Sequence, residues 1–166
     1  MRALLVTLAL AALSACGLKP MYAGSSGQAV AQGLAEVEVA PIPGRDGWLV
    51  RTALNDRLQV TGQRPAPRYR LEVQLDDSLE ALGVLNDDTI SRERRILRAR
   101  YQLVDIASGT ILLDATAGSD AGIDVVSSEY ATIAAEQTAL ENLARDVAER
   151  MARRVALRLR EVGQPQ

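Results

Sequence analysis

The sequence has 166 residues, with 19 Lys and Arg against 21 Asp and Glu, one Cys, and neither His nor Phe. A formal net charge of −2 gives no sign of nucleic-acid binding. One cysteine excludes an intramolecular disulfide, and the absence of His removes the commonest acid–base side chain. We therefore expect one compact domain that is held together by packing of Leu, Val, Ile and Ala.

The N-terminus has the pattern of a secretory signal. Arg2 precedes an apolar run from Ala3 to Ala12, which is too short for a transmembrane helix of about 20 apolar residues. Leu-Ser-Ala-Cys follows and resembles the lipobox of bacterial lipoproteins, in which the cysteine is acylated and the preceding signal is removed. We therefore predict that residues 1–15 are a lipoprotein signal peptide and that Cys16 is the lipidation site. The alternative is an incidental free thiol.

The chain after the cysteine is predicted to start loosely and then fold. Residues 16–33 are expected to be a lipidated N-terminus and flexible tether, because they are rich in Gly, Ser, Ala and Gln and lack a hydrophobic period. Leu34–Pro41 alternates apolar and polar residues, which predicts a strand. A helix is expected over about residues 47–61, with Asp46 as its N-cap. Its apolar stripe would consist of Trp48, Leu49, Ala53, Leu54 and Leu58.

Three further strands are predicted from a period of two. The second strand starts at Arg68, the third covers about Thr89–Ile106, and the fourth covers about Thr110–Ala117. In the second strand the core side would carry Tyr69, Leu71, Val73 and Leu75, and the other side Arg68, Arg70, Glu72, Gln74 and Asp76. Short turns at Asn86-Asp87-Asp88 and Ser108-Gly109 predict an antiparallel meander, because parallel pairing needs a longer crossover.

A long amphipathic helix is predicted from about Glu129 to Val162. Its apolar stripe would consist of Tyr130, Ile133, Ala134, Leu140, Leu143, Ala144, Val147, Ala148, Met151, Val155 and Leu159. The expected fold is α/β, as an α+β sandwich: a four-stranded mixed sheet with two helices packed on one face, in the order β-α-β-β-β-α. This domain would cover residues 34–162, and residues 163–166 would form a C-terminal tail.

The sequence carries no motif that indicates catalysis. It contains no Gly-rich phosphate loop, no zinc-ligand spacing and no Ser-centred elbow. The acidic pairs Asp76/Asp77 and Asp87/Asp88 are interpreted as solvated residues at the end of a hairpin, because they lack the spacing of a calcium loop. We expect neither an enzyme nor a metal site nor a bound cofactor.

Arginines in the third strand suggest an anion-binding surface. Parity places Leu97, Ala99, Tyr101 and Leu103 on the core face, and Arg92, Arg94, Ile96, Arg98, Arg100 and Gln102 on the other. Pairing with the second strand would add Arg68 and Arg70. We call these six arginines (Arg68, Arg70, Arg92, Arg94, Arg98 and Arg100) the arginine face and expect a basic surface that binds phosphate groups. The alternative is an ordinary solvated face or a charged edge that discourages aggregation.

A family resemblance supports this interpretation. The run from Cys16 to Tyr22, Cys-Gly-Leu-Lys-Pro-Met-Tyr, resembles the opening of the alphaproteobacterial LptE family of lipopolysaccharide-assembly lipoproteins. The start of the long helix, Ser-Glu-Tyr-Ala-Thr at residues 128–132, also resembles that family. The predicted order of elements through Val162 is similar to the family's two-helix, four-strand fold.

The resemblance implies a function that is based on binding. It implies a lipoprotein, lipid-anchored on the periplasmic side of the cell outer membrane, that plugs the LptD β-barrel and assists assembly of that barrel. It also implies that the protein binds lipopolysaccharide during transport to the cell surface, and no nucleic-acid partner is expected. The alternative is an accessory or structural envelope lipoprotein with no part in lipopolysaccharide transport.

Overall fold

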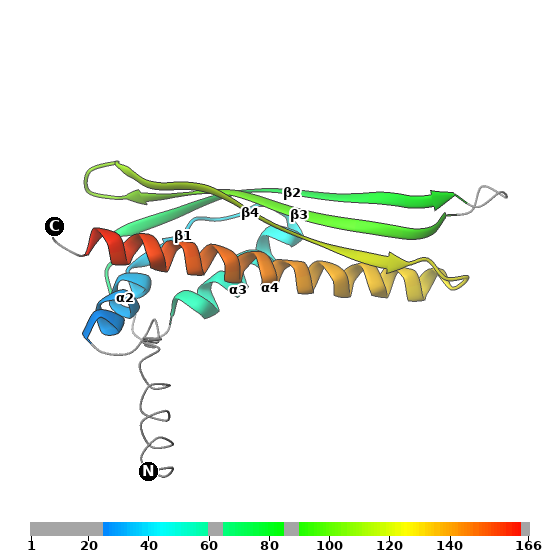
Figure 1. The fold of residues 1–166 in the computed structure, drawn as a ribbon, viewed down its shortest axis with the longest axis horizontal. Helices are drawn as coiled ribbons and strands as arrows, with labels where there is room; N and C mark the ends of the chain where they lie inside the picture. Colours follow the sequence, from blue (N-terminus) through cyan, green and yellow to red (C-terminus); the bar gives the residue numbers. More distant parts are fainter. Residues whose placement is uncertain (1–24, 60–64, 85–89, 164–166) are drawn as a thin grey trace, which may run out of the picture.

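A computed structural model describes residues 25–59, 65–84 and 90–163 as a two-layer α/β domain. Figure 1 shows one layer of helices packed against one face of an elongated sheet. The element order is α-β-α-β-β-β-α. The predicted mixed sheet of four strands with helices on one face is confirmed, and the N-terminal helix is an addition to the two that the sequence predicted. The elements are α2 Ser25–Ala35, β1 Val37–Val39, α3 Gly44–Leu58, β2 Tyr69–Val84, β3 Ile90–Asp105, β4 Ile111–Asp124 and α4 Glu129–Val162.

Helix α2 occupies residues that the composition had predicted as a tether. The prediction of a flexible segment is wrong for residues 25–33, because Val30 and Leu34 lie one helical turn apart and are both buried in the core. Leu34 therefore ends a helix instead of beginning a strand, and β1 is shortened to three residues. The first described element of the chain is therefore a helix that begins at Ser25.

Helix α3 is confirmed as an element, but two of its details differ from the prediction. Asp46 lies in the first turn and does not cap the helix, since the N-cap residue is Pro43. Trp48 is 64% exposed. The buried stripe instead consists of Gly47, Val50, Ala53, Leu54 and Leu58. The predicted stop at Gly62 lies outside the described residues.

The strand order β1-β2-β3-β4 follows the chain. Strand β1 runs parallel to β2, while β2–β3 and β3–β4 are antiparallel, so the predicted meander is confirmed. Strand β2 is 16 residues long. Asp76 and Asp77 therefore lie within a strand, opposite Arg98 and Leu97, and not at a hairpin end as predicted. Asp87 and Asp88 lie outside the described residues.

Strand β4 continues through the Gly/Asp/Ser-rich stretch that the sequence suggested was a connection. It reaches Asp124 and pairs with β3 along that length. Gly118 and Gly122 lie opposite Arg98 and Arg94. The side chain of Arg98 lies over Gly118, and the side chain of Arg92 lies over Gly122. Pairing with β3 therefore extends β4 through this stretch, and its glycines leave room for the arginine side chains of β3.

Helix α4 is continuous over the predicted residues, Glu129–Val162. At 1.5 Å per residue it is about 50 Å long and lies along the whole sheet (Figure 1). Ser128 is its N-cap, and the Ser128 hydroxyl accepts a hydrogen bond from the backbone N–H of Ala131. The predicted stripe is buried from Leu140 to Leu159, but Tyr130, Ile133 and Ala134 are exposed. None of the helices described in the structure is long and apolar enough to cross a membrane.

Candidate functional site

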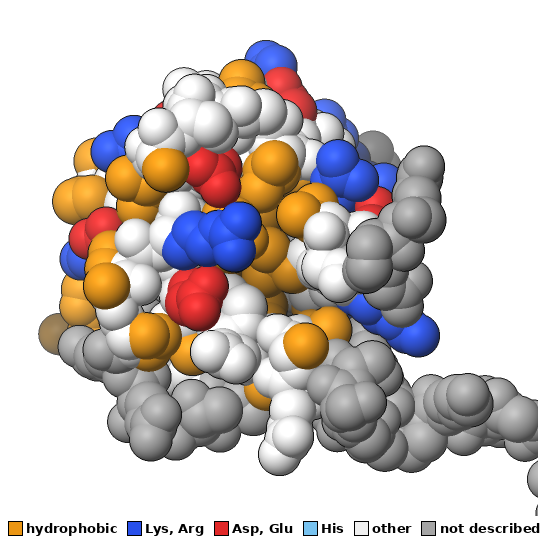
Figure 2. Space-filling view, turned by 90° about the vertical axis from the view of Figure 1, so that its left-hand side faces the viewer, with side chains coloured by type: hydrophobic (Ala, Val, Ile, Leu, Met, Phe, Trp, Pro, Cys, Tyr) orange, Lys and Arg blue, Asp and Glu red, His pale blue; other side chains and the backbone are white. Residues whose placement is uncertain are grey.

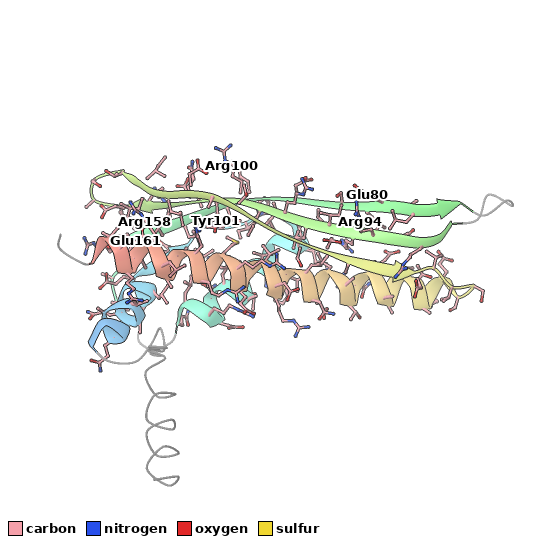
Figure 3. The ribbon with its side chains drawn as sticks, viewed as in Figure 1. Glu80, Arg94, Arg100, Tyr101, Arg158 and Glu161 are labelled. Carbon is pink, nitrogen blue, oxygen red and sulfur yellow. The ribbon has the colours of Figure 1, made fainter. Side chains whose placement is uncertain are left out.

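The candidate site is the face of the sheet that points away from the helices. All three described helices pack on the opposite side, so no helix within the described residues covers this face (Figure 1). Side chains alternate between the two faces, as neighbouring Arg100 and Tyr101 illustrate in Figure 3. Arg100 is exposed, whereas Tyr101 points towards α4 and is buried.

The structure brings the predicted arginines together on this face. The core residues Leu97, Ala99, Tyr101 and Leu103 are buried, and their neighbours Arg98 and Arg100 are exposed, which confirms the parity of β3. Antiparallel pairing with β2 places Arg70 on the same face, and Arg68 lies just before β2. The positions predicted for the arginine face are therefore confirmed, while its binding role stays a prediction.

The expected basic surface carries carboxylates as well as arginines, so its positive charge is largely neutralised. Carboxylates from β2 and β4, and from Asp105 at the end of β3, alternate with the arginines, because acidic residues occupy the outward positions of the flanking strands. The ion pairs are Arg94–Glu80 at 2.8 Å, Arg70–Glu72 at 3.1 Å, Arg100–Asp114 at 3.1 Å, Arg92–Asp124 at 3.4 Å and Arg68–Asp105 at 3.8 Å. Glu72 and Asp76 were already on this side in the predicted strand, so the sequence contained part of this signal.

Ion pairs and hydrogen bonds on this face shift the pKa values of several of its side chains. The hydrogen bond from Arg100, followed by one from Gln102 at 2.8 Å, lowers the pKa of Asp114. In return, Asp114 raises the pKa of Arg100, and Glu80 raises the pKa of Arg94. The Asp105 carboxylate accepts hydrogen bonds from the backbone N–H and hydroxyl of Ser108, and these lower its pKa. Asp114 and Asp105 therefore stay ionised at lower pH than unperturbed aspartates.

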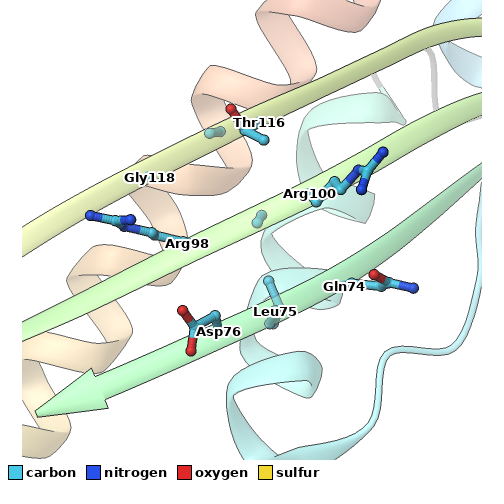
Figure 4. Close-up of a pocket in the computed structure, with 9 residues that line it drawn as sticks. Gln74, Leu75, Asp76, Arg98, Arg100, Thr116 and Gly118 are labelled. Carbon is cyan, nitrogen blue, oxygen red and sulfur yellow. The ribbon is translucent and has the colours of Figure 1, made fainter.

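Arg98 differs from the other five arginines. Its side chain forms no ion pair or hydrogen bond with any residue in the described ranges 25–59, 65–84 and 90–163. Its side chain extends towards Gly118 on β4, whereas Asp76 lies on the other side of it, on β2 (Figure 4). A Cβ atom at position 118 would be 3.4 Å from Cγ of Arg98, so glycine gives this side chain its space.

An open hollow of about 490 Å³ surrounds Arg98. Its lining residues come from the middle of β2, β3 and β4 and are mostly polar (Figure 4). They are Gln74, Leu75, Asp76, Arg98, Ala99, Arg100, Thr116, Ala117 and Gly118. Gln74 and Thr116 offer uncharged hydrogen-bonding groups beside two guanidinium groups, an arrangement suited to the oxygens of an anionic group.

The helix-facing side of the sheet contains a charged pair that sequence reasoning missed. Arg95 donates two hydrogen bonds to Asp77, at 2.9 and 2.6 Å, and a third at 3.1 Å to the backbone carbonyl of Glu136 in α4. The core residues of β2 and β3 have odd numbers, and so do Asp77 and Arg95, so alternation alone places both side chains on the helix-facing side. The pair was missed because Asp77 was interpreted as a solvated acid in a turn. Asp77 also raises the pKa of Arg95.

The arrangement is suited to binding. Within the described residues there is no group of three or more Asp, Glu, Cys or His side chains that could hold a metal ion. The open face presents a row of arginines in exposed ion pairs. The guanidinium group of Arg98 lies in the hollow without such a partner among the described residues. Together the fold and this face define a small two-layer α/β domain with an open, charged sheet face.

The domain is similar to solved structures of bacterial proteins whose descriptions call them lipoproteins. A crystallised Caulobacter crescentus CB15 protein described as a lipoprotein is 25% identical, with a TM-score of 0.67 over 82% of this chain and 98% of that one. A minor lipoprotein from Acinetobacter baumannii has 16% identity and a TM-score of 0.57, over 74% of this chain and 92% of that one. Rare lipoprotein B from Shewanella oneidensis has 10% identity and a TM-score of 0.56, over 76% of this chain and 100% of that one. The last two show the shared fold alone.

The family model LptE, described as lipopolysaccharide-assembly, matches residues 34–155. No curated protein matches the sequence significantly. Because the family model covers most of the chain, the chain belongs to the LptE family of lipopolysaccharide-assembly lipoproteins. The family suggested by the Cys-Gly opening is confirmed.

Proposed function

We propose that this LptE-family protein is anchored in the outer membrane by acyl chains on Cys16, plugs an LptD-type β-barrel and assists its assembly, and binds lipopolysaccharide during transport to the cell surface. The observation that carries the proposal is the match of the family model from residue 34 to residue 155. The signal-length apolar run directly before Cys16 supports the anchor. Two or more acyl chains hold a protein on a membrane stably, whereas one is marginal.

Lipopolysaccharide carries phosphate groups, and the open sheet face offers guanidinium groups for them. The ion pairs of the arginine face do not prevent this, because exposed pairs each stabilise a protein by only about 0–1 kcal/mol. A phosphate group that carries more charge than a carboxylate can therefore replace Glu80 or Asp114 as the partner of an arginine. Arg98 needs no such exchange, so we assign it the first contact.

Charge reversal tests the binding site. Arg98→Glu should weaken lipopolysaccharide binding by the purified chain about tenfold to a hundredfold, the equivalent of one lost hydrogen-bonded charge. Arg94→Glu combined with Arg98→Glu should weaken it further. Arg145→Glu is the matched control, since Arg145 is an exposed arginine on α4, away from the sheet face. Thermal melts should show folded protein in each case, and equal binding by Arg98→Glu and the control would reduce the arginine face to a solvated surface.

Replacing the cysteine tests the anchor and the partner. Cys16→Ser should abolish acylation, release the protein from the outer membrane and impair barrel assembly, while the folded domain keeps its affinity for lipopolysaccharide. Mass spectrometry of the mature N-terminus measures acylation, and affinity purification from solubilised outer membrane should recover an LptD-type barrel. Recovery of the unmodified protein with no such barrel would favour an accessory or structural envelope lipoprotein instead.

A further inference from the structure

One end of the molecule carries a surface of exposed apolar side chains. Ile106 and Ile111 flank the β3–β4 turn, and Leu157 and Val162 lie near the C-terminus of α4. Each of the four is more than 40% exposed. Figure 2 looks onto this end and shows hydrophobic side chains spread around a central basic residue, with acidic residues above and below it. We call these four side chains, together with Arg154, Arg158 and Arg160 of the same end of α4, the end surface.

The end surface has positive charge that is not neutralised. Its carboxylates are already engaged, Glu161 by Arg158 at 2.9 Å and Asp105 by Arg68 at 3.8 Å. Arg158 also donates a hydrogen bond of 2.7 Å to the carbonyl of Leu112 and so is held against β4 (Figure 3 labels Arg158 and Glu161). The side chains of Arg154 and Arg160 form no ion pair or hydrogen bond with any residue that the structure describes.

A groove combines both properties at this end. It has a volume of about 380 Å³ and lies between the start of β4 and the last turns of α4. Its lining combines apolar and charged residues: Leu112, Leu113, Asp114, Arg154, Leu157, Arg158 and Glu161. Both carboxylates are already paired, Asp114 with Arg100 and Glu161 with Arg158. An apolar side chain and an unpaired guanidinium thus share one opening, which suits a molecule with an apolar part beside an anionic part.

The chain enters the domain at this same end. Helix α2 packs beneath the C-terminal end of α4 (Figure 1), where Gly33 lies against Leu159. Residues 16–24 separate Cys16 from α2 and can span at most about 30 Å. Helix α4 alone is about 50 Å long, so an anchor at Cys16 holds the end surface, and not the opposite end of the sheet, near the bilayer.

We propose that the end surface docks end-on against an anionic phospholipid surface, with Arg154 and Arg160 meeting headgroup phosphates and the four apolar side chains entering the interfacial region. The partner is a lipid surface because apolar and unpaired basic groups are interspersed, as in proteins that lie at membrane interfaces. The argument for orientation rests on the proposed acylation of Cys16. The attraction to lipid rests on the end surface alone, so it can be tested without an anchor.

The test uses the chain from residue 16 onwards with Cys16→Ser. This chain keeps the whole core, whose members all lie between Val30 and Leu159. Co-sedimentation should show binding to vesicles that contain phosphatidylglycerol, weaker binding to pure phosphatidylcholine vesicles, and a decrease at high salt. Arg154→Glu combined with Arg160→Glu should weaken binding to the anionic vesicles at least tenfold. Arg45→Glu combined with Arg145→Glu makes the same change in net charge on α3 and α4, outside the end surface and the arginine face, and should have little effect.

A second matched pair of variants tests the apolar part. Ile111→Ser with Leu157→Ser should weaken vesicle binding severalfold, whereas Val126→Ser with Ile133→Ser should not, although all four side chains are 43–52% exposed. Absence of vesicle binding, or equal losses in both members of either pair, would overturn the docking proposal. Neither result would bear on acylation, which the mass of the mature N-terminus measures separately.

Discussion

Removing the Asp77 carboxylate should destabilise the domain far more than removing an exposed carboxylate from the same strand. In the structure Asp77 is the partner of Arg95, and their side chains are 19% and 18% exposed. Arg95 also reaches the backbone of Glu136, so the pair joins β2, β3 and α4. Asp77→Ala leaves a largely buried guanidinium whose one remaining hydrogen-bond partner among the described residues is the carbonyl of Glu136.

The expected cost follows from this burial. Breaking a fully buried ion pair costs about 3–5 kcal/mol, because the remaining charge is desolvated without compensation. Arg95 keeps some contact with solvent and one hydrogen bond, so we expect about 2–3 kcal/mol for Asp77→Ala. For a chain of this size such a loss lowers Tm by roughly 5–10 °C. Arg95→Met in addition to Asp77→Ala should restore part of the loss, because no buried charge is then left.

Glu80→Ala is the matched control. Glu80 is also a β2 residue bound to a β3 arginine, at 2.8 Å from Arg94, but the two side chains are 47% and 42% exposed. The control should cost at most about 1 kcal/mol. Chemical denaturation with a shared m-value measures both free energies of unfolding. If Asp77→Ala cost no more than Glu80→Ala, burial would not be what gives the Asp77–Arg95 pair its strength.

Two further predictions concern helix α3 and the sheet face. Leu54→Ala should lower the free energy of unfolding by about 2–5 kcal/mol, because Leu54 is fully buried. Trp48→Ala should change the same free energy by about 0.5 kcal/mol or less, because Trp48 is exposed. Similar losses for the two variants in denaturant melts would contradict the burial pattern. The pKa of Asp114 is lowered from 3.8, mainly by Arg100, so its contribution to stability is complete above that value and is lost as the pH falls through the lower folded value. Arg100→Gln should raise this pKa towards 3.8 in an NMR titration, and Asp105, which Ser108 holds, should not move.

Sequence patterns predicted the elements with strong periodicity. Alternation placed Leu97 and Arg98 on opposite faces, and the spacing of apolar residues located α4 over its full length. These predictions succeeded because the period of a strand or helix fixes which side chains share a face. Composition misled where packing overruled it, as in α2, whose Val30 and Leu34 are buried in the core.

The sequence by itself determined the parity of the strands, the extent of α4, the lipobox-like run before Cys16 and the family resemblance. Only the tertiary structure decided how the charges of the arginine face are matched. Arg92, Arg94 and Arg100 pair with carboxylates on neighbouring strands, and these pairings depend on the register of β2, β3 and β4. Register depends on contacts between residues far apart in the chain, so it is not determined by local periodicity. The structure therefore singles out Arg98 among six arginines that looked equivalent in the sequence.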